Sequence, residues 1–189
     1  MSLTDLSNKY GSDKASRHSY TGKYEELFAP SKGKPVSLLE VGVLHGGSLM
    51  MWREYFPHGQ IHGVEDFSQK AGFGGKSVDG DATEAWLNQQ DRVTLFRVSC
   101  MDVPAMHAKI GGRIFDFVID DGCHSQEQQL SNIASLLPLV KPGGIYVCED
   151  VQAHTSKDAL QSAAAPMGKV SWYEGPKTSD DRLMIVHKT

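Results

Sequence analysis

Residues 36–49, "VSLLEVGVLHGGSL", contain the pattern that decides the fold. Apolar residues run to Val41 and are followed by Gly42, which is typical of a buried strand that enters a tight turn. Residues 46–56 continue with apolar side chains at helical spacing, and Pro57 ends this pattern. A strand, a glycine turn and a helix in this order predict the first unit of a parallel α/β sheet.

The same alternation of strand and helix continues along the chain. Residues 125–140 have the periodicity of an amphipathic helix, and the sequence KPGG is expected to turn the chain after it. Further strands are expected at residues 60–66, 92–99, 114–121, 145–150, 169–175 and 182–188. This order predicts a doubly wound α/β domain, with helices on both faces of a mainly parallel sheet.

The composition argues against several classes of protein. Charged residues make up 22% of the chain and the formal net charge is -4, so no basic field favours nucleic acid or an anionic membrane. The apolar runs are too short to span a bilayer, and the N-terminus lacks the apolar stretch of a signal peptide. The three cysteines form no CxxC pair, which argues against a zinc site and a disulfide framework. A reducing cytoplasm is therefore the expected compartment.

Acidic residues follow two strands that are expected to be neighbours in the sheet. Asp120 and Asp121 end the strand at residues 114–121, and Glu149 and Asp150 end the next strand. Ligands bind at the carboxyl ends of parallel strands, and neighbouring strands lie about 4.8 Å apart. The side chains of Asp121, Glu149 and Asp150 are therefore expected to converge on one point. Carboxylate oxygens are hard ligands that suit Mg²⁺, with Mn²⁺ or Ca²⁺ as alternatives.

His124 lies three residues beyond Asp121. An imidazole at this place could remove a proton from a substrate hydroxyl, because its pKa lies near neutrality. A divalent cation would lower the pKa of that hydroxyl and hold its oxygen. Structural roles remain open, because Asp121 could cap the following helix and the acids at residues 149–150 could form a solvated strand end.

A cofactor site is expected around the first two strands. Glu40 ends the first strand and is followed by Gly42 and Gly46, which let the backbone approach a ligand closely. Their spacing differs from the GxGxxG dinucleotide fingerprint and resembles motif I of class I S-adenosylmethionine (SAM) methyltransferases. Glu65 ends the second strand, where a carboxylate can accept hydrogen bonds from both hydroxyls of a ribose, and Asp66 is the alternative.

Motifs along nearly the whole chain together resemble one family. They are "YGSDKASRHSYTGKYEELFAP" (residues 10–30), "LLEVGVLHGGSLMMWREYFP" (residues 38–57), "IDDGCH" (residues 119–124) and "EDVQ" (residues 149–152). These segments are similar to those of the metal-dependent sugar O-methyltransferases of macrolide biosynthesis, the mycinamicin type. The chain looks related, more distantly, to the cephalosporin hydroxylase-like methyltransferases.

The resemblance implies a fold and a reaction. The fold would be a seven-stranded, Rossmann-like class I methyltransferase sheet that ends in an antiparallel hairpin, in a single domain of residues 1–189. SAM would be the methyl donor and a hydroxyl of a sugar or glycoside the acceptor. Relatives of this type oligomerise, so a homo-oligomer is expected.

The resemblance also assigns roles to residues. Magnesium would be held by Asp121, Glu149 and Asp150, and His124 would be the base. Residues 1–33 would fold over the cofactor and the active site. Gln152 would border the acceptor pocket.

The family usually carries Gly-Asp-Gln after the third strand, where this chain has Ser99, Cys100 and Met101. Backbone groups of the first two and the Met101 side chain are expected to meet the adenine instead. Tyr20 and Thr21 would lie at the methionine end of the cofactor. The residues expected to bind the cofactor are Tyr20, Thr21, Glu40, Gly42, Gly46, Ser48, Glu65, Ser99, Cys100, Met101 and Asp120.

Other functions remain open from the sequence. A class I methyltransferase could use His124 without a metal, on oxygen or nitrogen. A nicotinamide-dependent oxidoreductase on a Rossmann-like sheet and a non-catalytic module that binds SAM or a metal are two further alternatives. Residues 70–83, rich in glycine and charge, are expected to form a surface loop that is either a lid or a plain insertion.

Overall fold

The computed structural model describes residues 1–68 and 77–189. The first half of the glycine-rich loop expected at residues 70–83 lies outside the described residues, so its expected role as a lid or a plain insertion stays a prediction. Its last part belongs to an ordered element, because Asp79 caps a helix that begins at Gly80.

The core of the molecule is a seven-stranded sheet with the strand order β3-β2-β1-β4-β5-β7-β6. Its strands are β1 (Ser37–Val41), β2 (Gln60–Glu65), β3 (Val93–Arg97), β4 (Phe115–Asp120), β5 (Val140–Cys148), β6 (Gly168–Glu174) and β7 (Arg182–Lys188). The first five strands are parallel, whereas β7 is antiparallel to both β5 and β6. The predicted doubly wound sheet with a terminal antiparallel hairpin is confirmed. Its switch point lies between β1 and β4, where ligands bind in such sheets.

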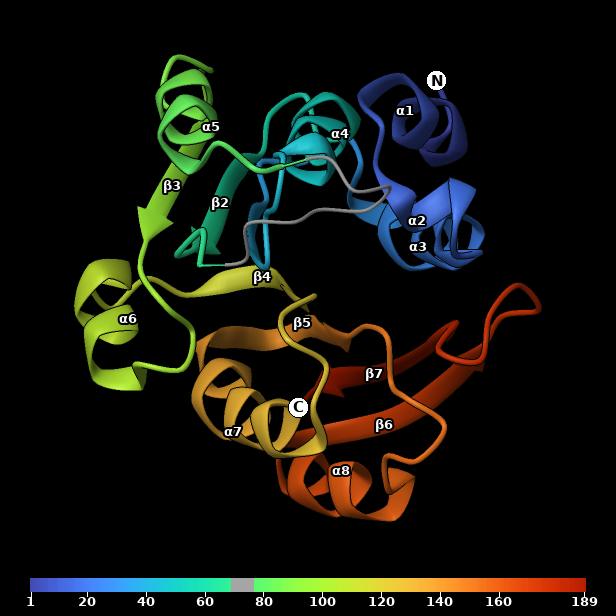
Figure 1. Cartoon of the computed structure of the whole chain (residues 1–189). Helices are drawn as coiled ribbons and strands as arrows, with labels where there is room; N and C mark the ends of the chain where they lie inside the picture. The colour runs from blue at the N-terminus through green and yellow to red at the C-terminus, as the bar shows by residue number, and fades with distance from the viewer. Residues whose placement is uncertain (69–76) are drawn as a thin grey trace.

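Helices cover both faces of the sheet (Figure 1). One face carries the N-terminal helices and two others: α1 (Leu3–Tyr10), α2 (Asp13–Ser16), α3 (Tyr20–Phe28), α4 (Gly47–Tyr55) and α5 (Gly80–Leu87). The other face carries α6 (Val103–Ile110), α7 (Gln126–Leu136) and α8 (Lys157–Ala164). Within the described residues, no helix combines the length and the apolar character needed to cross a membrane.

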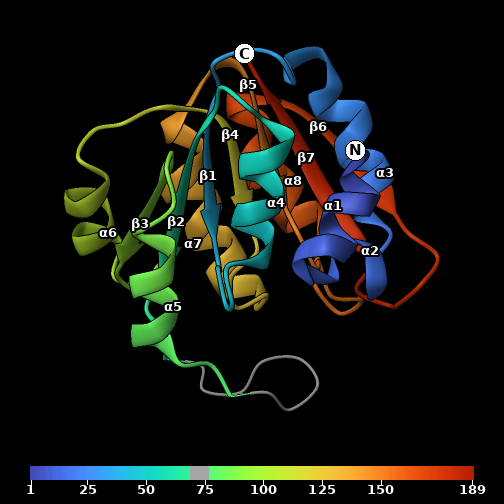
Figure 2. The same ribbon diagram turned by 90° about the horizontal axis from the view of Figure 1, so that it is seen from above.

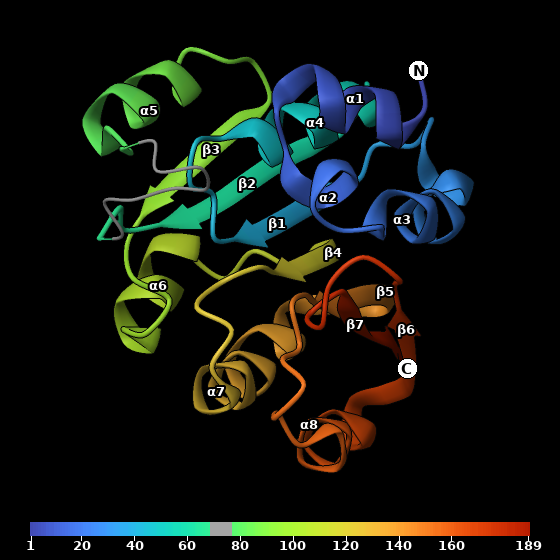
Figure 3. The same ribbon diagram turned by 45° about the vertical axis from the view of Figure 1, so that its right-hand side comes forward.

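Each face of the sheet has its own hydrophobic core, because successive strand residues point to opposite faces. The core under the N-terminal helices contains an aromatic cluster in which Phe28 of α3 lies against Phe117 of β4, with ring centroids 4.3 Å apart. Trp52 of α4 meets the edge of the Phe28 ring. These contacts fix α3 and α4 on the sheet, and Figures 2 and 3 show the N-terminal helices packed beside α4.

Two boundaries differ from the sequence-based expectation. The helix expected over residues 125–140 ends at Leu136 and continues as a 3-10 turn, because Pro138 has no N–H to donate to a further helical turn. The KPGG segment lies inside β5 instead of preceding it, and the register of β4 against β5 shifts between Phe115 and Phe117. Gly143, with φ +78°, accommodates this irregularity.

Candidate functional site

A cleft of about 780 Å³ opens at the carboxyl ends of the central parallel strands. It has the size of a small-molecule site and lies at the predicted place. Ten of the residues singled out from the sequence line it: Gly42, Ser48, Glu65, Asp66, Ser99, Cys100, Met101, Asp121, His124 and Asp150. The turn between α1 and α2 also lines it, through Gly11, Ser12 and Asp13. This turn belongs to residues 1–33, the segment expected from the resemblance to fold over the site, although the sequence analysis named none of these three residues.

The glycine turn after β1 brings two strand ends close together. Gly42 has φ +88°, and a Cβ at this position would lie 1.9 Å from the Asp121 carbonyl oxygen. The backbone of β1 therefore approaches the end of β4 as only glycine allows. Gly46, with φ +80°, precedes α4, and a Cβ there would contact Trp86 and Leu87 at 2.9 Å. Gly46 thus packs beneath α5, and among the described residues it does not line the cleft.

Glu65 at the end of β2 holds this turn in place. Its Oε2 accepts hydrogen bonds from the N–H groups of Val43, at 3.0 Å, and Leu44, at 3.1 Å. Its Oε1 accepts hydrogen bonds from the N–H groups of Asp66 and Phe67. The carboxylate therefore has a structural role in addition to facing the cleft.

Asp66 remains the alternative partner for a ribose. Burial raises the pKa of its carboxyl, but hydrogen bonds from Ser68 and Ser99 outweigh this effect and lower the pKa below its usual value. Asp66 is therefore a carboxylate at neutral pH, and it also lines the cleft.

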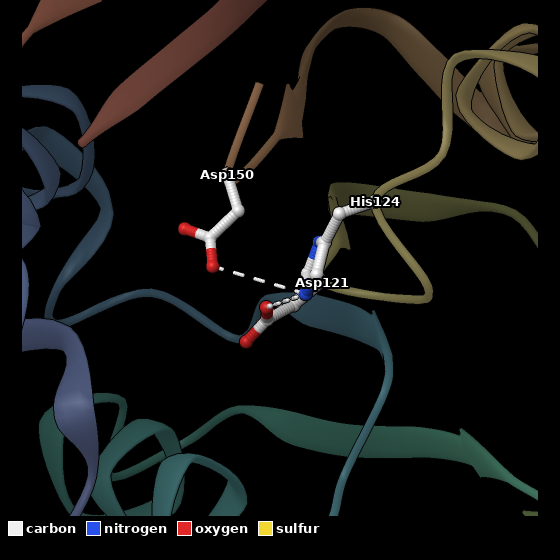
Figure 4. A group of neighbouring side chains, drawn as sticks. All are labelled: Asp121, His124 and Asp150. Atoms are coloured by element: carbon white, nitrogen blue, oxygen red, sulfur yellow. Dashed lines mark ion pairs between the residues drawn. The ribbon is translucent and has the colours of Figure 1, made fainter. Parts of the chain in front are cut away.

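At the β4 and β5 ends, two carboxylates and an imidazole face one another (Figure 4). His124 Nε2 lies 3.9 Å from Asp121 Oδ1 and 3.8 Å from Asp150 Oδ2. One ligand atom from each side chain falls within 4.8 Å of the other two, which is close enough to hold a metal ion. His124 and Asp150 have φ +54° and φ +50°, in the left-handed region that non-glycine residues adopt uncommonly.

The N-terminal helices supply the next layer of contacts. The Tyr20 hydroxyl donates a hydrogen bond to Asp150 Oδ1 at 2.6 Å, and His18 Nε2 lies 3.5 Å from Asp150 Oδ2. Burial and the charge of Asp121 raise the pKa of Asp150. Thr21 Oγ1 lies 2.9 Å from Thr4 Oγ1. The cleft lining formed by the described residues includes neither Tyr20 nor Thr21, and Tyr20 reaches the cleft only through its hydrogen bond to Asp150.

Lys14 of α2 lies between the remaining carboxylates, which the sequence analysis did not predict. Its Nζ is 2.7 Å from Asp121 Oδ2, 2.7 Å from Glu149 Oε1 and 3.2 Å from Glu40 Oε1. Burial lowers the pKa of Lys14, but the charges of these three carboxylates outweigh it and hold the pKa well above its usual value. The side chain is 1% exposed, so this is a fully buried ammonium group.

Glu149 and Glu40 thus face Lys14. The Tyr24 hydroxyl also donates a hydrogen bond to Glu149 Oε1, and the Ser48 hydroxyl donates to Glu40 Oε2 at 2.7 Å. Burial raises the pKa of Glu149 and of Glu40, and Lys14 opposes both shifts. The expected metal ligand Glu149 forms a second close group with Glu40 and Asp121, whereas Asp150 groups with Asp121 and His124.

Two further predicted residues lie beside the site. Asp120 is the last residue of β4 and directly precedes Asp121, and its side chain lies on the opposite face of the sheet. There it accepts hydrogen bonds from Asn132 of α7 and from the Tyr146 hydroxyl, and burial raises its pKa to about 6. Gln152 Nε2 donates to the Asp150 carbonyl at 3.3 Å. Neither residue belongs to the cleft lining in the described part of the chain.

The donor set fits a divalent cation. Asp121 Oδ1 and Asp150 Oδ2 are the hard oxygen ligands that such a cation prefers, and His124 Nε2 lies within 4 Å of both. The surrounding carboxylates outnumber the one buried ammonium group among the described residues. The same cleft extends to Glu65 and Met101. One bound molecule could therefore reach from the end of β3 to Asp121, His124 and Asp150, here called the acidic cluster.

A model of the methyltransferase domain family matches residues 39–151. The chain is 33% identical over 159 residues to 8-demethyl-8-alpha-L-rhamnosyl tetracenomycin-C 2'-O-methyltransferase of Streptomyces olivaceus. It is 34% identical over 159 residues to mycinamicin VI 2''-O-methyltransferase of Micromonospora griseorubida. Each alignment covers 79% of this chain but only 38% and 36% of these relatives, so more than half of each relative's length lies outside the match.

Solved structures show the same fold. The MycE methyltransferase from the mycinamycin biosynthetic pathway, solved with Mg, SAH and mycinamycin VI, aligns with all of this chain and 54% of its own, at a TM-score of 0.74 and 24% identity. A second MycE structure, with Mg and SAH, gives a TM-score of 0.72 and 26% identity. The resemblance inferred from the motifs is thus confirmed. Because the family model covers more than half of the 189 residues, the chain belongs to the methyltransferase domain family.

Proposed function

We propose that this protein transfers a methyl group from SAM to a hydroxyl of a sugar or glycosylated natural product, with the help of a divalent cation. One observation carries the proposal: Asp121, His124 and Asp150 meet in the same cleft that Glu65 and the glycine turn line. The names of the curated relatives, which are sugar O-methyltransferases, support the reaction class.

The cofactor would lie along the strand ends. SAM, when bound, supplies an electrophilic methyl group on a sulfonium sulfur. The backbone at Gly42 and the Ser48 side chain would hold its methionine end, because both line the cleft beside β1. Glu65 or Asp66 would accept hydrogen bonds from the ribose, and the residues after β3 would contact the adenine. This order would direct the methyl group toward the acidic cluster.

Asp121 and Asp150 would hold the cation, with His124 beside it. Glu149 is the third ligand predicted from the sequence, and its Oε1 already contacts Lys14 and Tyr24. The cation, when bound, would lower the pKa of the acceptor hydroxyl and orient it. His124 Nε2 would then accept the proton of this hydroxyl, since it faces both carboxylates at just under 4 Å. Alignment of the hydroxyl with the methyl group supplies most of the remaining rate.

The acceptor would enter beside the N-terminal segment, residues 1–33. The turn between α1 and α2 lines the cleft, and Tyr20 contacts Asp150 from the same segment. Gln152 follows the end of β5, and its Nε2 donates a hydrogen bond to the Asp150 carbonyl oxygen. From this position it would border the bound sugar. Residues 1–33 would then cover the site above both SAM and the acceptor.

Chelation tests the metal requirement. The protein is incubated with SAM and a panel of glycosides that includes mycinamicin VI, the acceptor named for one relative, and products are detected by mass spectrometry. We expect a product that is heavier by one methylene in the presence of Mg²⁺, loss of this product with EDTA, and its return with excess Mg²⁺. Transfer that continues unchanged in EDTA would contradict the metal-dependent mechanism.

A metal-independent methyltransferase is the second candidate, and one observation favours it. Lys14 already supplies a buried cation to Asp121 and Glu149, so part of the carboxylate charge is compensated without a metal. His124 alone would then be the base. The chelation experiment separates the two candidates, because only this one retains activity in EDTA.

A further inference from the structure

Two groups of possible metal ligands overlap at Asp121. The first comprises Asp121, His124 and Asp150, and the second comprises Glu40, Asp121 and Glu149. Asp121 Oδ1 faces the first group, at 3.9 Å from His124, whereas its Oδ2 faces the second group. A carboxylate shared in this way is the arrangement of a dinuclear metal site, in which two cations lie about 4 Å apart.

The second group is filled by the chain itself. Lys14 Nζ lies within 3.2 Å of an oxygen of each of its three carboxylates. An ammonium group is a compact point charge, so it can compensate three carboxylates as a small cation does, here with hydrogen bonds to Asp121 and Glu149 and an ion pair to Glu40. Glu40 Oε1 accepts no hydrogen bond from the described residues, so the charge of Lys14 is what compensates this buried oxygen.

We propose that the Lys14 ammonium group occupies the second cation position of a dinuclear-like carboxylate site, and so restricts the protein to one divalent cation, at Asp121 and Asp150. Lys14 is then a positioning residue: it holds Asp121 Oδ2 and Glu149 in the buried position and leaves Asp121 Oδ1 to the cleft. This inference rests on the proposed function in one respect, namely that a divalent cation binds at Asp121 and Asp150.

The competing explanation is that Lys14 merely anchors α2 to the sheet. Both explanations predict that loss of Lys14 weakens the fold, so stability and activity do not separate them. The number of divalent cations bound does, because three buried carboxylates without the ammonium group would attract a second cation.

The experiment counts Mn²⁺ ions bound per chain, after removal of metals with a chelator, by calorimetry and by the electron paramagnetic resonance of free Mn²⁺. The variants are Lys14→Met, which removes the charge at similar length, and Lys9→Met, which removes an exposed lysine of α1 paired with Glu54. We expect one ion for the wild type and for Lys9→Met, and two for Lys14→Met. The same number of ions in Lys14→Met and the wild type would overturn the proposal.

A double variant tests which carboxylates form the second position. Lys14→Met/Glu149→Gln removes one carboxylate together with the ammonium group, so we expect it to bind a single ion. Two ions in the double variant would show that Glu149 does not belong to the position and would overturn the proposal.

Poor folding of Lys14→Met does not prevent the test. Ions that bind only the native state raise the midpoint of thermal unfolding, and each additional bound ion adds to the rise. We therefore expect Mn²⁺ to raise the midpoint more for Lys14→Met than for the wild type. An equal or smaller rise would count against the proposal.

The two proposals can fail separately. If the wild type binds no Mn²⁺, the metal-dependent reaction is refuted. The inference about Lys14 still stands if Lys14→Met then binds one ion, and it is refuted if this variant binds none.

Discussion

Replacement of Gly42 by alanine should damage both the fold and the site. Alanine would place its Cβ 1.9 Å from the Asp121 carbonyl oxygen, whereas such contacts are essentially never shorter than 3.0 Å, so the two strand ends must separate by about 1 Å. Non-glycine residues at φ +88° cost about 1–2 kcal/mol, and overpacking of this kind costs about 1–3 kcal/mol more. We expect Gly42→Ala to lose about 2–5 kcal/mol of unfolding free energy.

The functional loss follows from the same displacement. Asp121 supplies oxygens to the proposed cation and to Lys14, and a misplacement of about 1 Å in an active site can reduce the rate roughly 100-fold. Denaturant unfolding measures the stability, and methyl transfer together with Mn²⁺ affinity measures the site. SAM binding should also weaken, because Gly42 lines the cleft.

Gly112→Ala is the matched control. Gly112 has φ +71°, but a Cβ there would have no heavy atom within 4 Å among the described residues. This variant should lose only about 1–2 kcal/mol and keep its transfer rate. If Gly42→Ala were as stable and as active as Gly112→Ala, the close approach of β1 to Asp121 would not matter and the reasoning would be refuted.

Three further outcomes are expected. His124→Ala should lower turnover by about 100-fold or more while the Kd for SAM changes little, because the imidazole acts on the acceptor proton; full turnover in this variant would exclude His124 as the base. Tyr20→Phe removes the hydrogen bond donor to Asp150 Oδ1 and should cost about 1.5–3 kcal/mol in urea unfolding, and an unchanged midpoint would show that this bond contributes nothing. Burial raises the pKa of Cys100 to about 11, so about one thiol in 1,000 is a thiolate at pH 8. Iodoacetamide should therefore modify Cys100 more slowly than the exposed Cys123. The rate at Cys100, measured by peptide mass spectrometry, should rise about tenfold per pH unit up to pH 11 and should fall when SAM is added. Equal rates for the two thiols would contradict the raised pKa of Cys100.

Much of the fold could be predicted from local pattern. Apolar runs such as residues 36–42 and 114–121 are long enough to specify buried strands, and the glycine turn after the first run specifies the βα unit. The start of β5 could not be predicted in this way. KPGG is a turn sequence by local chemistry, but pairing with β4 draws it into the sheet, since tertiary contacts override local preference.

The proposed acidic cluster was also accessible from the sequence. The ends of adjacent parallel strands meet at one edge of the sheet, so Asp121 and Asp150 had to lie close together once the strand order was assumed. The orientation of each side chain was less accessible. Asp120 faces α7 because residues alternate along β4, and Tyr20 faces Asp150 because α3 packs across the strand ends.

By itself, the sequence determined the alternation of strands and helices, the glycine turn and the placement of carboxylates at strand ends, because these depend on residues that are neighbours along the chain. Only the tertiary structure decided that Lys14 lies between Asp121 and Glu149, which are 107 and 135 residues away. The physical reason is that the apolar face of a helix indicates that it packs, but not which strand ends it will cover. The packing of the N-terminal helices against α4 and β4 therefore selects the partner of this buried charge.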